Sequence, residues 1–408
     1  MKKKVAIIGG GAAGLMAAYA AAKNGNDVTV FERNSRPARK VMITGKGRCN
    51  VTNNCENDTF LLNAPHGGRF MYSALSAFSC RDTIDFFENQ GVPLKTERGN
   101  RVFPVSDKAV DIVDALVSSA TKEGAKIVNA RVVSVGLSEG SVNSVLLENG
   151  KEFIFDKIII ATGGMSYPVT GSTGDGYRMA EALGHTVTNL RPSLVPIMTK
   201  ESFCTKLCGL SLKNVRLSLF VDGKKKAVFS ELGEMMFTDF GITGPLVLSA
   251  SAYIDKEPQF YTITIDLKSA LDAETLDKRI LRDFSLEPNK DFINSLDDLL
   301  PKRLISVIVH NTGIDPRKKV NNITREERQR LVKELKELTL HVLRLRPIEE
   351  AVVTSGGIKL KEIDPATMQS KLVNGLYFAG EIIDVDCFTG GFNLQVAFST
   401  GYLAGKSV

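Results

Sequence analysis

The sequence predicts an α/β protein in which one domain, built on a parallel sheet, carries an inserted β-barrel-like domain and an inserted helical domain. A strand, a glycine-rich turn, a helix and a second strand follow one another at the N-terminus. Two short apolar segments that end in small-residue turns occur much later, one of them close to the C-terminus. Between them the pattern changes first to alternation and then to helical periodicity. We therefore expect the first domain at residues 1–190 and 346–408, the β-rich insertion at 191–268 and the helical insertion at 269–345.

The composition is that of a large folded protein. The 408 residues are 43% hydrophobic and 24% charged, which suits two or three compact domains and excludes a disordered or fibrous chain. A formal net charge of +6 is compatible with an anionic partner but is too small to indicate binding to nucleic acid. Six scattered cysteines and four histidines, without CxxC or HxxxH spacing, predict reduced thiols, a cytoplasmic location and no metal site. No long uncharged apolar stretch predicts a membrane span, so we expect no stable membrane association.

The N-terminal segment predicts a complete βαβ unit. Val5–Ile8 is a short apolar strand, residues 9–14 form a turn, Leu15–Ala22 favours a helix, and Asp27–Phe31 is a second strand. A signal peptide is the alternative for this segment, since a basic start precedes an apolar region. The glycines inside that region have a specific purpose in the βαβ interpretation, which we therefore prefer.

The turn carries the spacing GxGxxG at Gly9, Gly11 and Gly14. The first glycine permits a tight turn, the second lets a pyrophosphate approach the backbone, and the third lets helix and strand pack closely. The helix N-terminus supplies N–H groups and a positive dipole end for phosphate oxygens. Glu32 ends the second strand and is placed to accept hydrogen bonds from a ribose diol. Strand, glycines, helix, strand and acid in this order predict a dinucleotide site.

Two later segments indicate which dinucleotide. Lys157–Gly164 is a strand that runs into the turn ATGG, and Gly375–Glu381 is a strand with the sequence GLYFAGE, followed by a helix that opens at Gly390–Ala397. This combination resembles the two-dinucleotide-binding flavoproteins, which implies a Rossmann-like FAD-binding domain. The resemblance implies that Glu381 contacts the ribitol or the pyrophosphate. It also implies that the helix after Gly390 points its N-terminus at the flavin pyrimidine.

A narrower resemblance covers almost the whole chain. Thr44–Asn53, Gly233–Pro245 and Thr354–Gly357 are similar to motifs of the BaiN-like family of FAD-dependent, NAD(P)H-utilising oxidoreductases. The resemblance implies FAD as cofactor and NADH or NADPH as a transient electron donor. Members of the family are linked to the reduction of conjugated enones of steroids or of uracil in ribosomal RNA.

The glycine motif and the two resemblances together assign the cofactor-binding residues. They comprise the N-terminal turn and second strand end, the segment around Thr44–Asn50, the ATGG turn and the C-terminal strand and helix start. The predicted residues are Gly9, Gly11, Ala13, Gly14, Glu32, Arg33, Lys40, Gly45, Gly47, Arg48, Cys49, Asn50, Ala161, Thr162, Gly163, Gly164, Gly380, Glu381, Gly391, Phe392, Asn393 and Leu394.

Two cysteines are the candidate catalytic residues. Reduction of a C=C bond requires a proton donor beside the flavin, and Cys49 is our first candidate because the neighbouring Arg48 is expected to hold its thiolate near neutral pKa. A buried packing residue is the alternative for Cys49. Cys387, just before the C-terminal helix, is the second candidate. Lys40, Arg48 and Asn50 could instead anchor the FAD phosphate or the flavin carbonyls.

The insertions give weaker signals. Val215–Val221 and Tyr261–Leu267 alternate as strands of a small barrel would. Thr324–Glu327 forms a capping box, and the apolar positions Leu331, Leu335, Leu338 and Val342 predict a helix that continues to the end of the insertion. The basic runs at 224–226 and 317–319 indicate solvated turns, with a phosphate-binding surface as the alternative.

These observations predict an NAD(P)H-dependent FAD enzyme. Only one GxGxxG is present, so a nicotinamide donor would use the same flavin face as the substrate. We expect hydride transfer from flavin N5 to a C=C bond conjugated to a carbonyl, in a small molecule or in ribosomal RNA. The segment Thr170–Ala180 is similar to fumarate reductase flavoproteins, which makes a dicarboxylate oxidoreductase one alternative. A non-catalytic flavin-binding or RNA-associated module is the other.

Overall fold

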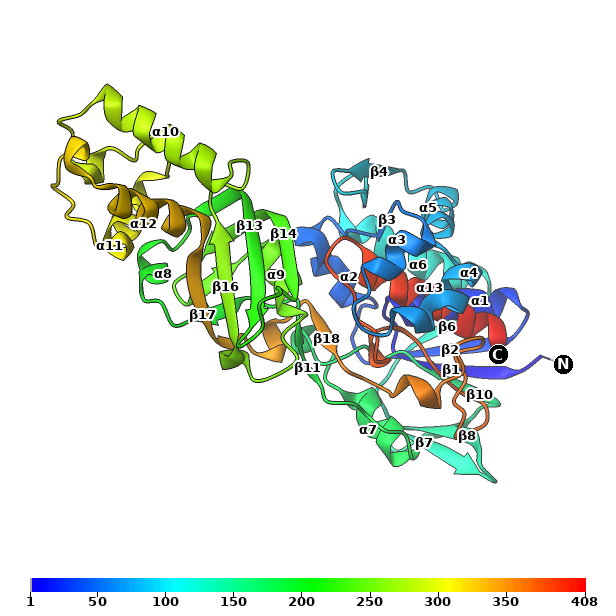
Figure 1. The fold of residues 1–408 in the computed structure, drawn as a ribbon. Helices are drawn as coiled ribbons and strands as arrows, with labels where there is room; N and C mark the ends of the chain where they lie inside the picture. Colours follow the sequence, from blue (N-terminus) through cyan, green and yellow to red (C-terminus); the bar gives the residue numbers. More distant parts are fainter. Residues whose placement is uncertain (1) are drawn as a thin grey trace. The chain divides into compact units, whose positions relative to one another are not determined.

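A computed structural model describes residues 2–408 and divides the chain into two compact units (Figure 1). The first unit contains the chain up to Ser193 together with Pro347–Val408, and the inserted unit is Leu194–Arg346. Each unit buries its own cluster of apolar side chains. The β-rich and helical segments expected as separate insertions thus share one compact unit and one core.

A parallel sheet forms the centre of the first unit. Its strands, in spatial order, are β19 (Leu376–Phe378), β10 (Lys157–Ile160), β1 (Lys4–Ile8), β2 (Asp27–Glu32) and β6 (Lys126–Asn129). Val5, Ala6 and Ile7 of β1 are completely buried, as expected of a strand covered on both faces. Because β19 pairs with β10, the C-terminal segment completes the sheet that the N-terminal segment starts. The predicted α/β fold class, with a Rossmann-like sheet, is confirmed.

Two helices far apart in sequence pack closely beside this sheet. They are α1 (Ala12–Lys23) and α13 (Phe392–Ser407), which lie side by side in Figure 1. A Cβ atom at Gly401 would collide with the carbonyl oxygen of Ala13, and one at Gly405 would collide with that of Ala17. Glycines four residues apart on one helix therefore allow two backbones to approach within contact of each other. This contact fixes the start of α13 relative to the glycine-rich turn.

Smaller elements surround the central sheet of the first unit. Three smaller sheets have the orders β3-β5-β4, β7-β8-β9 and β11-β18. Their strands are β3 (Thr52–Asn53), β4 (Leu94–Glu97), β5 (Arg101–Pro104), β7 (Val132–Ser138), β8 (Ser141–Leu147), β9 (Glu152–Ile154), β11 (Arg191–Ser193) and β18 (Val353–Ser355). The remaining helices are α2 (Arg39–Ile43), α3 (Asn57–Leu62), α4 (Tyr72–Ala77), α5 (Cys80–Asn89), α6 (Ala109–Lys122) and α7 (Asp175–Ala182).

The inserted unit is a closed barrel with helices. The barrel order is β12 (Ile197–Thr199), β15 (Gly241–Thr243), β14 (Phe229–Phe237), β13 (Ser211–Val221), β16 (Tyr261–Asp266) and β17 (Leu338–Leu345). The helices are α8 (Phe203–Lys206), α9 (Pro245–Ser251), α10 (Ala273–Leu286), α11 (Lys302–Thr312) and α12 (Arg325–Lys336). The β-barrel and the helical region that the sequence predicts are therefore both present.

One predicted element of the insertion is wrong. The capping box of Thr324 and Glu327 starts α12 as predicted, but the helix ends at Lys336, and Leu338–Leu345 is the barrel strand β17. Leu338, Leu340 and Val342 are buried, and the residues between them are exposed. The apolar period thus changes from helical to alternating at Leu338, and this alternation selects a strand.

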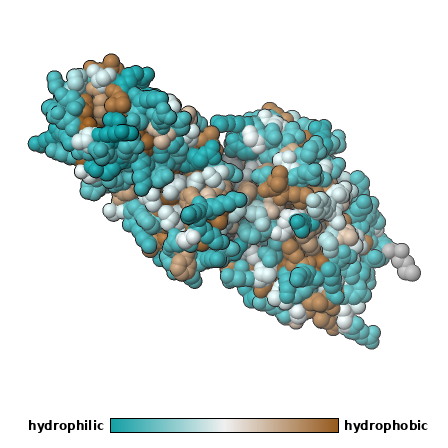
Figure 2. Space-filling model, viewed as in Figure 1, coloured by the Kyte–Doolittle hydropathy of each residue, from teal (hydrophilic) through white to brown (hydrophobic). Residues whose placement is uncertain are grey.

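The surface is predominantly hydrophilic on the face seen in Figure 2. Two members of the basic run at 317–319 are neutralised within the inserted unit, since Lys318 pairs with Glu327 at 2.7 Å and Lys319 pairs with Asp291 at 2.8 Å.

Among residues 2–408, no helix has both the length and the apolar character needed to cross a bilayer.

Candidate functional site

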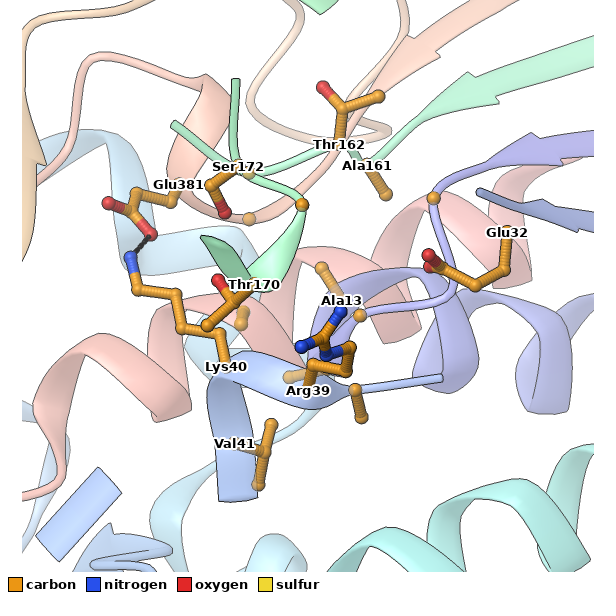
Figure 3. A pocket seen from close by; sticks show the side chains of 18 of the residues that line it. Ala13, Glu32, Arg39, Lys40, Val41, Ala161, Thr162, Thr170, Ser172 and Glu381 are labelled. Atoms are coloured by element: carbon orange, nitrogen blue, oxygen red, sulfur yellow. Dashed lines mark hydrogen bonds and ion pairs between the residues drawn. The ribbon is translucent and has the colours of Figure 1, made fainter. Parts of the chain in front are cut away.

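A pocket opens where three parallel strands of the central sheet end. Strands β1, β10 and β19 run into the loops that begin at Gly9, Ala161 and Ala379, and all three loops line the pocket. The carboxyl ends of parallel strands meet at one edge of a sheet, which is where α/β proteins of this kind bind ligands. Figure 3 shows Glu32 on one side of this pocket and Lys40 with Glu381 on the other.

Each of the three glycines in the glycine-rich turn meets a different steric requirement. Gly9 has φ +102°, and a Cβ atom there would lie 2.6 Å from the Ala161 carbonyl oxygen. A Cβ atom at Gly14 would collide with the carbonyl oxygen of Gly9. At Gly11 the backbone is ordinary, with φ −81°, and a Cβ atom would have no protein atom within 4 Å. Gly11 lines the pocket directly before α1, so its lack of a side chain keeps open the space in front of the helix N-terminus.

Glu32 supports the glycine-rich turn and also faces the pocket. Its Oε2 accepts a hydrogen bond from the Gly10 N–H at 2.8 Å, and its Oε1 accepts from the Asn34 N–H and side-chain amide at 2.7 and 2.8 Å. A carboxylate has about four lone-pair directions. One acceptor position on Oε2 therefore remains for a ligand hydroxyl, and the other three hold the loop in shape.

Lys40 and Glu381 form an ion pair on the other side of the pocket. Lys40 Nζ lies 2.6 Å from Glu381 Oε2, and both side chains are partly buried. Glu381 Oε1 accepts hydrogen bonds from the Thr354 N–H at 2.8 Å and from Ser166 Oγ at 3.0 Å. Two predicted residues that are separated by more than three hundred positions thus lie together on the pocket wall (Figure 3).

Thr162 adds a polar group without a partner. Its hydroxyl oxygen is buried, and no residue within 2–408 forms a hydrogen bond with it. Buried hydroxyls in folded proteins are nearly always hydrogen-bonded. Thr162 lines the pocket, but its hydroxyl is directed towards Gly176, where a Cβ atom would collide with it.

The structure separates the predicted cofactor residues into two groups. Those that line the pocket are Gly9, Gly11, Ala13, Glu32, Arg33, Lys40, Ala161, Thr162, Gly163, Gly380, Glu381, Asn393 and Leu394. Those that do not line it are Gly14, Gly45, Gly47, Arg48, Cys49, Asn50, Gly164, Gly391 and Phe392. Gly14 of the second group supports the pocket indirectly, because it packs against the carbonyl oxygen of Gly9, a lining residue.

Cys49 has an environment opposite to the one expected. Its side chain is completely buried, and burial raises the pKa of the Cys49 thiol to about 12. The Arg48 guanidinium, which we expected to lower that pKa, pairs with Glu97 and Asp107 and lies 4.2 Å from the ring centroid of Phe103. The expectation of a thiolate near neutral pKa is therefore wrong, because the thiol is buried and Arg48 is engaged by two carboxylates.

Cys387 is also a buried thiol. Burial raises the pKa of Cys387 well above its usual value. Its backbone N–H donates to the Asn393 side-chain oxygen at 2.9 Å, and the Asn393 amide donates to the Cys387 carbonyl at 2.8 Å. Asn393 thus joins the loop before α13 to the first turn of that helix, and Asn393 itself lines the pocket.

Sequence reasoning missed one wall of the pocket. Thr170, Gly171 and Ser172 line it, and the Thr170 carbonyl accepts a hydrogen bond from the Asn34 side chain at 3.0 Å. Asp175, at the start of α7, pairs with Arg33 and Arg131 at 3.1 Å each. The glycine-rich segment at 170–176 is similar to fumarate reductase flavoproteins, and that similarity is the signal that could have added it to the predicted site. Arg39 and Val41 of α2 also line the pocket.

The fold and the pocket define a dinucleotide-binding protein of the Rossmann class. The chain belongs to the HI0933-like family, because the family model described as HI0933-like protein Rossmann domain matches residues 3–407. The family is one of FAD-binding flavoprotein oxidoreductases, and the resemblance to BaiN-like flavoproteins is confirmed.

Two relatives match along nearly their whole length. The chain is 30% identical to the 3-dehydro-bile acid delta(4,6)-reductase of Clostridium scindens, over 99% of this chain and 98% of the relative. It is 34% identical to the ribosomal RNA dihydrouridine synthase of Haemophilus influenzae, over 98% of this chain and 97% of the relative.

A solved structure shares the fold. The 3-ketosteroid-delta4-(5alpha)-dehydrogenase of Rhodococcus jostii aligns with a TM-score of 0.53 at 16% identity, covering 100% of this chain and 96% of that one. At this identity the likeness supports the fold alone.

Proposed function

We propose that the protein is an NAD(P)H-dependent flavin reductase that saturates a C=C bond conjugated to a carbonyl group. The proposal rests mainly on one observation: the two relatives that match along nearly their whole length are named for reactions of the same kind. One is named as a delta(4,6)-reductase of an oxidised bile acid, and dihydrouridine is uridine whose ring C=C bond beside a carbonyl has been saturated. Both names describe the addition of two hydrogens to such a bond, so the substrate class proposed here is a small enone or uracil in RNA.

The pocket suits FAD in two respects. The open space at Gly11 in front of α1 suits a pyrophosphate, whose charge the helix N-terminus favours. The remaining acceptor position of Glu32 suits a ligand hydroxyl group. Gly9, Gly11, Glu32, Lys40 and Glu381 would then hold the cofactor. When bound, FAD supplies hydride chemistry at its ring, and the protein supplies position, charge and a proton.

The protonation of the two candidate thiols is defined by their burial. With raised pKa values, Cys49 and Cys387 both carry their protons at neutral pH. Either thiol is therefore proposed as a donor of a proton and not as a nucleophilic thiolate. Replacement of each by serine, one at a time, distinguishes the two candidates.

The proposal is tested by anaerobic reduction of the purified protein. NADH or NADPH should bleach the flavin absorbance. A 4-en-3-one steroid or a uracil-containing fragment of ribosomal RNA should then restore it, with one equivalent of saturated product. Reoxidation by fumarate alone would favour the dicarboxylate alternative. Failure of both nicotinamides to bleach the flavin would indicate a module in which FAD has no catalytic use.

A further inference from the structure

A buried carboxylate joins three segments of the first unit next to the pocket. Asp386 is completely buried and accepts hydrogen bonds from His66 Nδ1 at 2.9 Å, Ser193 Oγ at 2.8 Å and Ser355 Oγ at 3.0 Å. His66 Nε2 lies 3.1 Å from a terminal nitrogen of Arg191. Asp386, His66 and Arg191 therefore form a continuous chain of hydrogen bonds that leads from the protein interior to Arg191, a partly exposed residue.

The contact with Arg191 fixes the tautomer of His66. A guanidinium has only N–H donors and cannot accept a hydrogen bond. His66 Nε2 must therefore accept from Arg191, and the ring proton must reside on Nδ1, which donates it to Asp386. The imidazole ring thus links the carboxylate of Asp386 to the guanidinium of Arg191.

This chain of residues borders the candidate FAD pocket. Val385, which precedes Asp386, lines the pocket, and so does Val353, the register partner of Ser193 in the β11–β18 pair. The neighbouring Thr354 donates its N–H to Glu381, which lies across the pocket from Glu32 in Figure 3. Asp386, His66 and Arg191 thus adjoin the residues of the wall on the Glu381 side, and neither His66 nor Arg191 is itself a lining residue of the FAD pocket.

The guanidinium keeps unused donors. Arg191 has five N–H donors in a fixed plane, and within residues 2–408 it donates to His66 alone. Two other titratable groups face this cluster. Burial raises the pKa of Asp384, which interacts with Asp386, His66 and Arg191. Burial also raises the pKa of Cys387, which interacts with Asp386. Nothing in a purely structural role for Asp386 requires the arginine, because two serines and the imidazole already provide the carboxylate with hydrogen bonds.

We propose that Arg191, positioned by His66 and Asp386, binds the carbonyl oxygen of the substrate and stabilises the negative charge that forms there. The inference rests on the proposed function. When a hydride and its electron pair reach the β carbon of an enone, the π electrons move to the carbonyl oxygen and give an enolate. A proton added at the α carbon then restores the carbonyl. Donors preorganised around such an oxygen stabilise the charge as it develops. Arg191 is the catalytic residue of this arrangement, and His66 and Asp386 are positioning residues.

The test uses 4-nitrophenol, whose phenolate places a negative oxygen on a conjugated ring. Binding to the FAD-loaded protein is measured by titration, and the absorbance of the phenolate form gives the apparent pKa of the bound phenol. Wild-type protein should bind the phenolate and lower that pKa. Arg191→Met should weaken binding at least about tenfold, the loss expected for a charged hydrogen bond, and should abolish the pKa shift. Arg191→Lys should restore part of the shift, because it keeps the charge but loses the planar set of donors.

The positioning residues are tested by the same readout. His66→Ala should reduce the phenol pKa shift without changing FAD content, and Asp386→Asn should do so while retaining hydrogen-bonding groups and the melting temperature. Arg81→Met, which removes an exposed arginine from α5, is the matched control and should bind as wild type does.

Two results keep the inference separate from the proposed function. Unchanged phenolate binding in Arg191→Met, with wild type still reducing an enone, would refute the role of Arg191 and leave the reductase proposal standing. Arg191-dependent phenolate binding in a protein that reduces no enone and no uracil would support the oxyanion site and refute the reductase proposal.

Discussion

Replacement of Gly11 separates cofactor binding from folding. Gly11 has φ −81°, which any residue adopts, and a Cβ atom there would have no protein neighbour within 4 Å. Gly11→Ala should therefore leave folding unharmed, and the smaller entropy of the unfolded chain should add about 0.4–1 kcal/mol to the free energy of unfolding. Gly11→Val should be tolerated by the same open space.

The expected cost to FAD binding is large. A side chain in front of α1 would displace the phosphate from the helix N-terminus and remove about two charged hydrogen bonds, each worth about 1.5–3 kcal/mol. The loss of about 3–6 kcal/mol corresponds to a decrease in FAD affinity of about 10²-fold or more. Gly14→Ala is the matched control, because its Cβ atom would collide with the Gly9 carbonyl oxygen. It should lower the free energy of unfolding by about 1–3 kcal/mol.

The assay combines two measurements on each variant. The ratio of flavin to protein absorbance gives FAD content, and urea unfolding of the FAD-free proteins gives stability. We expect Gly11→Val to be stable and colourless, and Gly14→Ala to be destabilised even without cofactor. Wild-type FAD affinity in Gly11→Val would show that the space in front of α1 does not hold the pyrophosphate, and the assignment of the pocket would fail.

Three further predictions concern other parts of the first unit. Glu32→Ala should lose about 1–3 kcal/mol of FAD binding energy and should also lower the free energy of unfolding, because the carboxylate supports Gly10 and Asn34. FAD titration and urea unfolding measure the two effects. Unchanged values of both would contradict the geometry of the loop. Cys49→Ser should leave NAD(P)H reduction of the flavin unchanged and slow its reoxidation by olefin by about 10²-fold; stopped-flow reoxidation at the wild-type rate would assign Cys49 to packing. Burial lowers the pKa of His185 in the folded protein below its ordinary 6.5. As the pH falls below 6.5, the unfolded chain therefore binds a proton at this residue before the folded protein does. The free energy of unfolding should fall with pH until the lowered pKa is reached. His185→Gln should flatten this part of the profile in urea unfolding between pH 4 and 7, and an equally steep profile would show that other groups are responsible.

Local patterns account for what the sequence predicted correctly. The strand, turn and helix that become β1, the glycine loop and α1 are specified by residues within one short segment, so hydrophobic period and glycine spacing suffice. The same holds for β10 and β19, whose apolar residues end in small-residue turns. That these strands lie side by side follows from the general rule that a parallel sheet collects the carboxyl ends of its strands at one edge.

Ambiguous periodicity explains the error at β17. Leu331, Leu335, Leu338 and Val342 follow a spacing of three to four residues, which fits one face of a helix. Leu338 and Val342 also fit an alternating pattern once Leu340 is included. Short apolar segments satisfy both periods, and the pairing of β17 with β16 and β12 in the barrel decides between them.

The electrostatic environment of the site depends on contacts that no local pattern contains. Arg48 is next to Cys49 in sequence, yet its guanidinium is held by Glu97 and Asp107, which are 49 and 59 residues away, and the buried thiol remains protonated. Conversely, nothing in the sequence joins His66 to Asp386, whose separation is 320 residues. Sequence proximity therefore pointed to a cation beside a thiol, whereas the fold pairs a cation with an imidazole and a buried carboxylate. Because such a chain of hydrogen bonds fixes both a tautomer and the direction of a guanidinium, the group that stabilises charge on the substrate should be sought at Arg191, and Cys49 is a candidate for delivery of the proton only.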